Sequence, residues 1–235
     1  MSGLTISGPV DGVVVAELDR PPGNLWTVEL CRELTSLLLS PPADAHVLRL
    51  RSAGEVFCLG RERGGTTPGE LRQEATVLVE TTRALRRTRL VTVAEVQGDA
   101  AGFGVGVVSA CDVSVAVASA RFSFPEVEIG LAPALVLAWL PRVVGEREAF
   151  WLTATGEQLA ASRAAELDLV NAVVPTLDAL REDVDARVAA LRRRSPRVHA
   201  DIRDMIRAMA PLGDDAALDM SVDRLVVGSL RRGEA

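Results

Sequence analysis

Apolar residues in the first half of the chain follow two alternating patterns, short continuous runs and helical periodicities. The runs LTISG and GVVVAELDR predict two strands joined by a turn over residues 9–12. Thr27 can cap a helix that the Pro41-Pro42 pair would end, and its apolar residues recur at helical spacing: Leu30, Leu34, Leu37 and Leu38. HVLRLRS and VTVAEV predict two more strands, separated by the flexible-looking RERGGTTPG and a helix over about residues 70–87. Strands that alternate with helices favour an α/β fold with crossover connections.

From Pro141 onward the pattern becomes mostly helical. The segments GEREAFWLTATG, SRAAELDL and LDALREDVDARVAALRRR each predict a helix. The break near Pro175 is the best candidate for a boundary. We therefore expect an α/β core over residues 1–175 and a helical region over residues 176–235.

Composition and charge narrow the class of protein. The 235 residues, 48% apolar and 25% charged, suit one soluble globular domain with a sizeable core. The net charge of −6 is spread along the sequence, which argues against a nucleic-acid partner or an anionic membrane. The chain has neither a run of the ~20 apolar residues that span a bilayer nor a basic-then-apolar leader. We therefore expect a cytoplasmic location.

Two residue types bear on ligands. The chain has no lysine, so every fixed cation is an arginine, which binds phosphate through a planar fork of donors. Cys31, Cys58 and Cys111 lie far apart in apolar surroundings. This spacing predicts buried thiols rather than a disulfide framework or a zinc site.

A glycine-rich loop, Gly98-Asp-Ala-Ala-Gly-Phe-Gly-Val-Gly106, follows the VTVAEV strand and precedes an apolar run. Glycines allow a close approach of the backbone to a ligand, and a helix N-terminus offers unpaired N–H groups to negative charge. The loop lacks the ending of a phosphate-binding P-loop and the glycine spacing of a dinucleotide-binding turn. Taken alone, it suits a tight strand-to-helix corner as well as a binding site.

The segment FSFPEVEIGL carries the candidate acid–base group. Pro125 fixes the backbone before Glu126, and apolar neighbours would raise the pKa of this carboxyl if it is buried. Such a group is suited to proton transfer. Taken alone, the segment favours a surface glutamate at a strand end.

Together and in order, these segments resemble the enoyl-CoA hydratase/isomerase family, also called the crotonase superfamily. VFCLGRE resembles the family's AFCAGAD segment, EVQGDAAGFGVGVVSACDVSVA resembles NGxAxGGGxELALACDIRIA, and ARFSFPEVEIGLAP resembles AKFGxPEINLGLxP. LTATGEQLAASRAAELDLVNAVVP resembles a fourth family segment without a gap. The resemblance implies a spiral core of ββα units, a C-terminal helical region that builds trimers, and a coenzyme A thioester as substrate.

The resemblance also implies an oxyanion hole, in which two backbone N–H groups bind the thioester oxygen as the substrate becomes an enolate. These donors map to Arg61, in Cys58-Leu-Gly-Arg61, and to Phe103, in Gly102-Phe-Gly104. Removal of one such donor typically costs ~3 kcal/mol of transition-state stabilisation. The family has smaller residues at both positions, so we expect added bulk, and at Phe103 a backbone that glycine would adopt more easily.

The family's hydratases have two glutamates, and this chain matches only one. Glu126 stands at the second position, whereas Gly106 stands where the first is found. A single carboxylate can remove a proton at one carbon and return it at another. The chain thus resembles Δ3,Δ2-enoyl-CoA isomerases, and double-bond migration is favoured over hydration. Hydration with a replacement carboxylate, Glu62 or Glu128, stays open, although we expect Glu62 to cap a helix or form a surface ion pair.

The resemblance gives a wider set of substrate-binding positions: Pro21, Pro22, Asn24, Leu59, Arg61, Glu62, Arg63, Gly102, Phe103, Gly104, Pro125 and Ala134. Arg20, Arg61 and Arg63 could bind the phosphates or be solvated. The apolar stretch over residues 134–140 replaces a glycine-rich family segment. It suits helix packing better than the lining of a pocket for cyclic dienoyl-CoA thioesters.

The expected assembly is a homotrimer or dimer of trimers, although the chain ends earlier than the family's usual length. No metal and no cofactor beyond the substrate's own coenzyme A are expected. The alternative from another class is a non-catalytic, crotonase-like protein that binds acyl-CoA.

Overall fold

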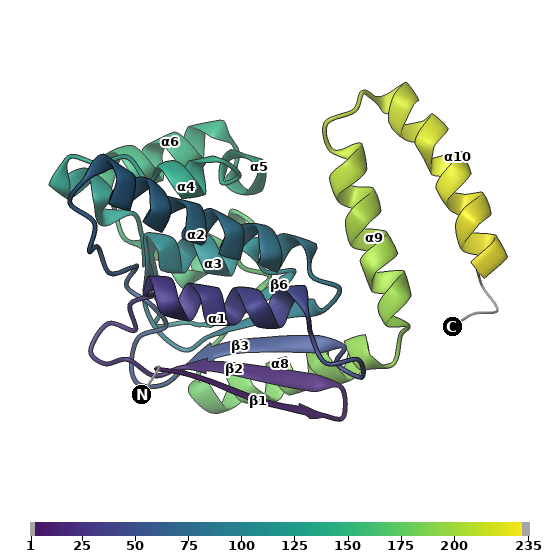
Figure 1. The fold of residues 1–235 in the computed structure, drawn as a ribbon, viewed down its shortest axis with the longest axis horizontal. Coiled ribbons are helices and arrows are strands. Elements are labelled where there is room, and N and C mark those ends of the chain that lie inside the picture. The colour runs from purple at the N-terminus through teal and green to yellow at the C-terminus, as the bar shows by residue number, and fades with distance from the viewer. Residues whose placement is uncertain (1–2, 232–235) are drawn as a thin grey trace.

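The computed structural model describes residues 3–231, which form an α/β fold (Figure 1). The elements follow in this order, with η1 a 3-10 helix: β1 (Leu4–Val10), β2 (Val13–Leu18), α1 (Val28–Leu39), β3 (Val47–Ser52), α2 (Pro68–Arg87), β4 (Val91–Val96), β5 (Ala100–Ala101), α3 (Phe103–Ala110), β6 (Val113–Val117), β7 (Arg121–Ser123), η1 (Pro125–Ile129), α4 (Ala134–Leu137), α5 (Pro141–Val144), α6 (Glu146–Thr155), β8 (Leu159–Ala160), α7 (Ala161–Glu166), β9 (Ala172–Val174), α8 (Leu177–Arg192), α9 (Pro196–Met209) and α10 (Asp214–Leu230).

The main sheet has the strand order β1-β2-β3-β4-β6-β9. β1 and β2 are antiparallel, as expected for a hairpin, and every other neighbouring pair is parallel. Parallel neighbours need crossover connections, and α1, α2 and α3 supply those from β2 to β6. These three helices lie on one face of the sheet and α8 lies on the other (Figure 1). The predicted α/β fold with crossovers is confirmed.

The central strand β4 is buried on both faces, which explains its unbroken apolar character. Val91 and Val93 belong to a cluster with Leu180, Val184 and Val188 of α8. Ala94 and Val96 belong to the larger cluster beneath α1, α2 and α3. α8 therefore packs on the core, although it falls in the region predicted as a separate helical part. The division at residue 175 stays a prediction.

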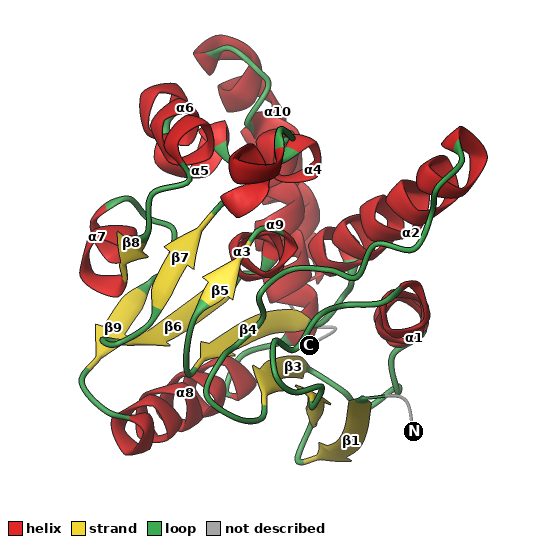
Figure 2. Cartoon of the chain, turned by 90° about the vertical axis from the view of Figure 1, so that its left-hand side faces the viewer, coloured by secondary structure: helices red, strands yellow, loops and turns green. Residues whose placement is uncertain are grey.

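A second sheet, β5-β7-β8, stands beside the main one (Figure 2). Cys58 forms a parallel bridge with Ala100 of β5, and Arg61 forms another with Trp26. The segment before α2 therefore runs alongside the segment before α3. This pairing unites two regions that the sequence separates by about forty residues.

Side-chain caps set the starts of the first two helices. Thr27 caps α1 as predicted, by accepting a hydrogen bond from the helix backbone. α2 begins at Pro68, earlier than the predicted residue 70, because Thr67 and Glu70 form a capping box. The RERGGTTPG stretch was expected to be flexible, but Glu70 and Glu74 accept hydrogen bonds from its backbone N–H groups. The backbone hydrogen bonds hold the pKa of Glu70 at about 2.

α9 is attached to the core through a buried arginine. Arg203 donates to Thr88 O, to Leu90 O at 2.7 Å and to Asp112 Oδ2 at 2.7 Å. Asp112 also accepts from the backbone and side chain of Thr92, so it has a structural role. Figure 1 shows α10 beyond α9, at the edge of the fold, and none of the residues of α10 is buried. Within residues 3–231, no helix has the length and apolar character needed to cross a membrane.

Candidate active site

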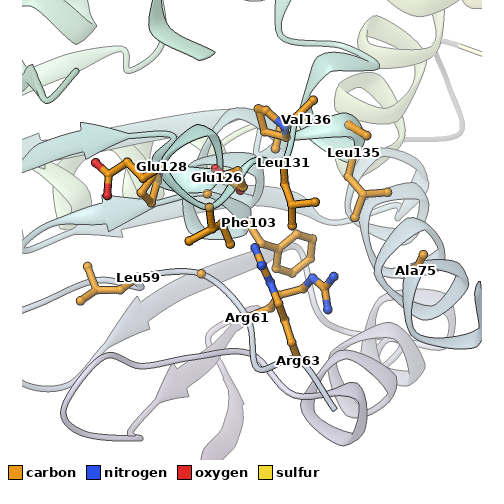
Figure 3. Close-up of a pocket in the computed structure, with 17 residues that line it drawn as sticks. Leu59, Arg61, Arg63, Ala75, Phe103, Glu126, Glu128, Leu131, Leu135 and Val136 are labelled. Atoms are coloured by element: carbon orange, nitrogen blue, oxygen red, sulfur yellow. The ribbon is translucent and has the colours of Figure 1, made fainter. Parts of the chain in front are cut away.

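A cavity of about 440 Å³ lies between α2, the segment before it, the start of α3 and the η1–α4 segment (Figure 3). Many of the predicted site residues line it: Leu59, Arg61, Arg63, Gly102, Phe103, Pro125, Glu126 and Ala134. In Figure 3 the two arginines lie on one side and Leu131 and Leu135 on the other. The structure thus brings the predicted carboxylate and both predicted donor residues to one cavity.

The backbone N–H of Arg61 is free to bind a ligand. Trp26 donates to Gly60 O at 3.1 Å and accepts from Glu62 N at 2.8 Å. In a parallel ladder these flanking groups point toward the partner strand, so the N–H of Arg61 itself points away from Trp26. Within residues 3–231 it has no acceptor.

Phe103 offers a second free N–H because it is the first residue of α3. Within the described chain this group has no acceptor, and the positive end of the helix favours an anion beside it. Gly102, just before it, has φ +51° and ψ −117°, a conformation that glycine alone adopts readily. The expectation of a glycine-like backbone at Phe103 is therefore wrong. Phe103 is helical, and the position that requires glycine is Gly102, one residue earlier.

Glu126 lies directly over Gly102. A Cβ atom built on Gly102 would stand 2.5 Å from Glu126 Oε1. The other oxygen, Oε2, is buried without a hydrogen-bond partner within the described chain. Burial raises the pKa of Glu126, and a backbone hydrogen bond and the charges of Arg63 and Arg61 oppose this shift. A carboxyl with one unpaired, buried oxygen is available for proton transfer.

The backbone around Glu126 differs from the predicted strand end. Residues 125–129 form the 3-10 helix η1, with Pro125 in its first turn and Gly130 in the left-handed conformation at its end. Proline presets the helical φ angle and glycine permits the reversal, so this segment cannot continue as a strand. The turn directs Glu126 inward, which a strand-end interpretation misses.

Gly106, the position of the missing glutamate, lies one turn into α3 and is covered by apolar side chains. A Cβ built there would be 3.0 Å from Val136 Cγ2 and 3.6 Å from Trp139 Cζ2. The space is therefore occupied rather than empty.

The two candidate replacement carboxylates behave differently. Glu62 does not line the cavity and pairs with Arg20 at 2.6 Å, the surface ion pair expected from the sequence. Glu128 lines the cavity but is exposed, and Figure 3 shows its carboxylate directed away from Glu126. Neither stands beside Gly106.

Other predicted binding positions lie outside this cavity. Asn24 is buried, and its side-chain amide donates to Ala53 O and Val56 O, both at 2.8 Å. Gly104 packs against the backbone of Cys58. Pro21, Pro22 and Glu62 are exposed and also lie outside the cavity lining. Asn24 and Gly104 therefore have structural contacts within the protein. A role of Pro21, Pro22 and Glu62 in binding coenzyme A stays a prediction.

Charge at the cavity comes from two arginines in different settings. Arg61 Nη1 pairs with Glu74 Oε2 at 3.2 Å, and Glu74 also accepts from Gly64 N and Gly65 N. Glu74 thus fixes the segment that carries the first amide donor. Arg63 is exposed and has no ion-pair partner within residues 3–231, so it can meet an anionic ligand.

Apolar lining residues complete the site, and they belong to a segment that the sequence predicts to serve in helix packing. Leu135 and Val136 line the cavity, while Trp139 and Leu140 are buried in the core. This stretch therefore serves both in helix packing, through Trp139 and Leu140, and in lining the cavity, through Leu135 and Val136. No group of three or more metal-ligating side chains occurs within residues 3–231.

Comparison with known proteins identifies the family of this chain. The model of the enoyl-CoA hydratase/isomerase family matches residues 9–225. A protein of Rhodobacter capsulatus named "Probable enoyl-CoA hydratase" is 33% identical over 206 residues, which cover 84% of this chain and 79% of the relative. A peroxisomal Δ(3,5)-Δ(2,4)-dienoyl-CoA isomerase of Arabidopsis thaliana is 27% identical over 185 residues, covering 72% and 66%.

A solved enoyl-CoA hydratase from Bacillus anthracis superposes on this fold with a TM-score of 0.86 at 25% identity, covering 95% of this chain and 89% of that one. The relatives are named as enzymes, which does not favour the non-catalytic alternative. The family match spans both amide donors and Glu126. This chain is therefore an enzyme of the enoyl-CoA hydratase/isomerase family.

Proposed function

We propose that this enzyme moves the double bond of a 3-enoyl-CoA thioester to the 2-position by proton transfer through Glu126. The observation that carries the proposal is a carboxyl, Glu126, that lies over Gly102 with Oε2 unpaired, in one cavity with the residues whose N–H groups are free, Arg61 and Phe103. A base of this kind and two fixed donors are what enolate formation needs.

The reaction has two proton transfers. Glu126 takes a proton from C2, and the electron pair moves onto the thioester oxygen, which accepts hydrogen bonds from the amides of Arg61 and Phe103. The protonated carboxyl then returns its proton to C4, and the double bond re-forms between C2 and C3. No cofactor beyond the coenzyme A of the substrate takes part.

Burial serves this chemistry because it raises the pKa of Glu126. A base accepts a proton from a weakly acidic carbon more readily when its own pKa is higher. Arg61 and Arg63 oppose the shift, and Arg63 is also placed to meet a phosphate of coenzyme A.

Hydration is the second candidate, because most of the similar proteins are named as enoyl-CoA hydratases. It would need a second group to hold water, and neither Glu62 nor Glu128 stands beside Gly106. We favour isomerisation for this reason. A cytoplasmic homotrimer or dimer of trimers, expected from the resemblance, belongs to the same proposal.

The test is to incubate purified protein with 3-enoyl-CoA and, separately, with 2-enoyl-CoA, and to identify the products by chromatography. We expect 2-enoyl-CoA from the first substrate and little 3-hydroxyacyl-CoA from the second. Glu126→Gln should abolish turnover while thioester binding persists. The control Glu128→Gln should retain turnover. Binding without turnover in the unaltered protein would favour the acyl-CoA-binding alternative, and rapid hydration would favour a hydratase.

A further inference from the structure

The place beside Gly106 is filled by two apolar side chains from the α4 segment. Val136 Cγ2 would lie 3.0 Å from a Cβ at this position, and Trp139 Cζ2 and Cη2 would lie 3.6 Å and 3.8 Å away. Val136 is 2% exposed and Trp139 is 7% exposed. Even a methyl group on Gly106 requires Val136 to move.

Hydrogen bonds fix Trp139 against the same helix. Its indole N–H donates to Ser109 Oγ at 2.9 Å, and Ser109 Oγ donates to Gly106 O at 3.1 Å. The ring is thereby held to the turn of α3 that contains Gly106. Its one polar group is satisfied within the protein, so it presents only carbon to Val136.

Val136 stands between this filled space and the cavity. It lines the cavity together with Leu131, Leu135 and Phe103. An ordered water needs two to four polar partners, roughly, and these neighbours supply apolar side chains. Glu126 is the carboxylate that remains at this end of the cavity, because Glu128 is directed away.

We propose that Val136, backed by Trp139, determines the outcome of the reaction by occupying the space from which a second carboxylate would hold water. The inference rests on the proposed isomerase function. With this space closed, the proton removed from C2 stays on Glu126 until it reaches C4. No water oxygen is then positioned to bond to C3 while its proton goes to C2.

Thermal unfolding tests the filled space without reference to activity. The cycle compares Gly106→Ala in three backgrounds: the unaltered chain, Val136→Ala and Val144→Ala. Val144 is a matched control because it is a buried valine outside the cavity lining. We expect Gly106→Ala to lower the Tm less, or raise it more, in the Val136→Ala background than in the other two. The reason is that Val136→Ala removes the Cγ2 atom that would lie 3.0 Å from the new methyl group.

Product analysis in D2O tests the consequence for the reaction. We expect Val136→Ala to isomerise 3-enoyl-CoA with several-fold more deuterium at C4 than the unaltered enzyme, because solvent can then exchange with the carboxyl proton. Val144→Ala should leave the deuterium content unchanged. The double variant Gly106→Glu with Val136→Ala should hydrate 2-enoyl-CoA about 100-fold faster than Gly106→Glu alone, the lower end of what a positioned acid–base group contributes.

The two measurements separate the possible failures. Additive Tm effects of Gly106→Ala and Val136→Ala, in an enzyme that still isomerises, would overturn the role of Val136. Equal deuterium content in the Val136→Ala and Val144→Ala products would overturn it as well. The absence of isomerisation in the unaltered enzyme, with non-additive Tm effects, would instead contradict the proposed function and with it the role of Val136 in its outcome.

Discussion

Gly102→Ala is the substitution for which the structure gives the most definite expectation. The new methyl group would lie 2.5 Å from Glu126 Oε1 and 3.2 Å from its Cδ, so the carboxylate must move away. The backbone at φ +51° and ψ −117° must also change or bear strain. Such strain costs about 1–3 kcal/mol.

The catalytic cost comes from the two groups that Gly102 positions. If the backbone relaxes, the N–H of Phe103 turns with it, and loss of one oxyanion donor costs about 3 kcal/mol, or about 100-fold in rate. Displacement of Glu126 adds to this loss. We therefore expect kcat/KM to fall by at least about 100-fold, whereas the stability cost stays within the strain range above.

The assay is steady-state isomerisation of 3-enoyl-CoA together with thermal unfolding of the same samples. Gly54→Ala is the control, because Gly54 has φ +76° and its Cβ would meet no atom within 4 Å. It should lower the Tm through strain alone and leave kcat/KM unchanged. A loss of one donor should lower kcat/KM by far more than about threefold. A folded Gly102→Ala enzyme whose kcat/KM stays within about threefold of the unaltered value would therefore refute the role of Gly102 in positioning Glu126 and the Phe103 amide.

Three further expectations follow from the same geometry. Because burial raises the pKa of Glu126 above the ordinary glutamate value, kcat/KM should fall as the pH drops through that raised pKa and the carboxylate becomes protonated. Glu126→Gln should raise the Tm at neutral pH, because the folded protein disfavours the charged carboxylate that the substitution removes. Glu74→Ala should lower kcat/KM about tenfold, because it releases the segment that carries the Arg61 amide. A tenfold loss is roughly half the free-energy cost of one lost oxyanion donor. The control Glu80→Ala, on the exposed side of α2, should leave kcat/KM unchanged. Arg203→Ala should lower the free energy of unfolding, measured with denaturant, by about 3 kcal/mol, because it leaves the carbonyls of Thr88 and Leu90 without their buried donor and removes one ion-pair partner of Asp112. A loss below about 1 kcal/mol would contradict that role.

The pattern of the sequence predicted the fold where local signals were strong. The caps, the apolar runs and the turn residues gave the hairpin, the parallel strands and the first helix, because each depends on residues close together in the chain. α2 begins two residues before the predicted start, because Thr67 and Glu70 form a capping box and Pro68 occupies the first turn.

The site could be predicted only in part. The resemblance to the family pointed to Glu126 and to the two amides, whereas the segment around Glu126 taken alone predicted a surface glutamate. The direction of its side chain depends on η1, which that interpretation as a strand end does not include. The covering of Gly106 by Val136 and Trp139 depends on contacts between α3 and α4. No local pattern records such a contact, because α4 reaches α3 through tertiary packing.

The central claim is that one carboxyl faces an enolate whose oxygen is held by two backbone amides. A crystal structure of Glu126→Gln with bound 3-enoyl-CoA tests it most directly. The account predicts the thioester oxygen within about 3 Å of the amide nitrogens of both Arg61 and Phe103, with the side chain at 126 beside C2. A thioester oxygen bound elsewhere, or a residue 126 turned away from the acyl group, would contradict it.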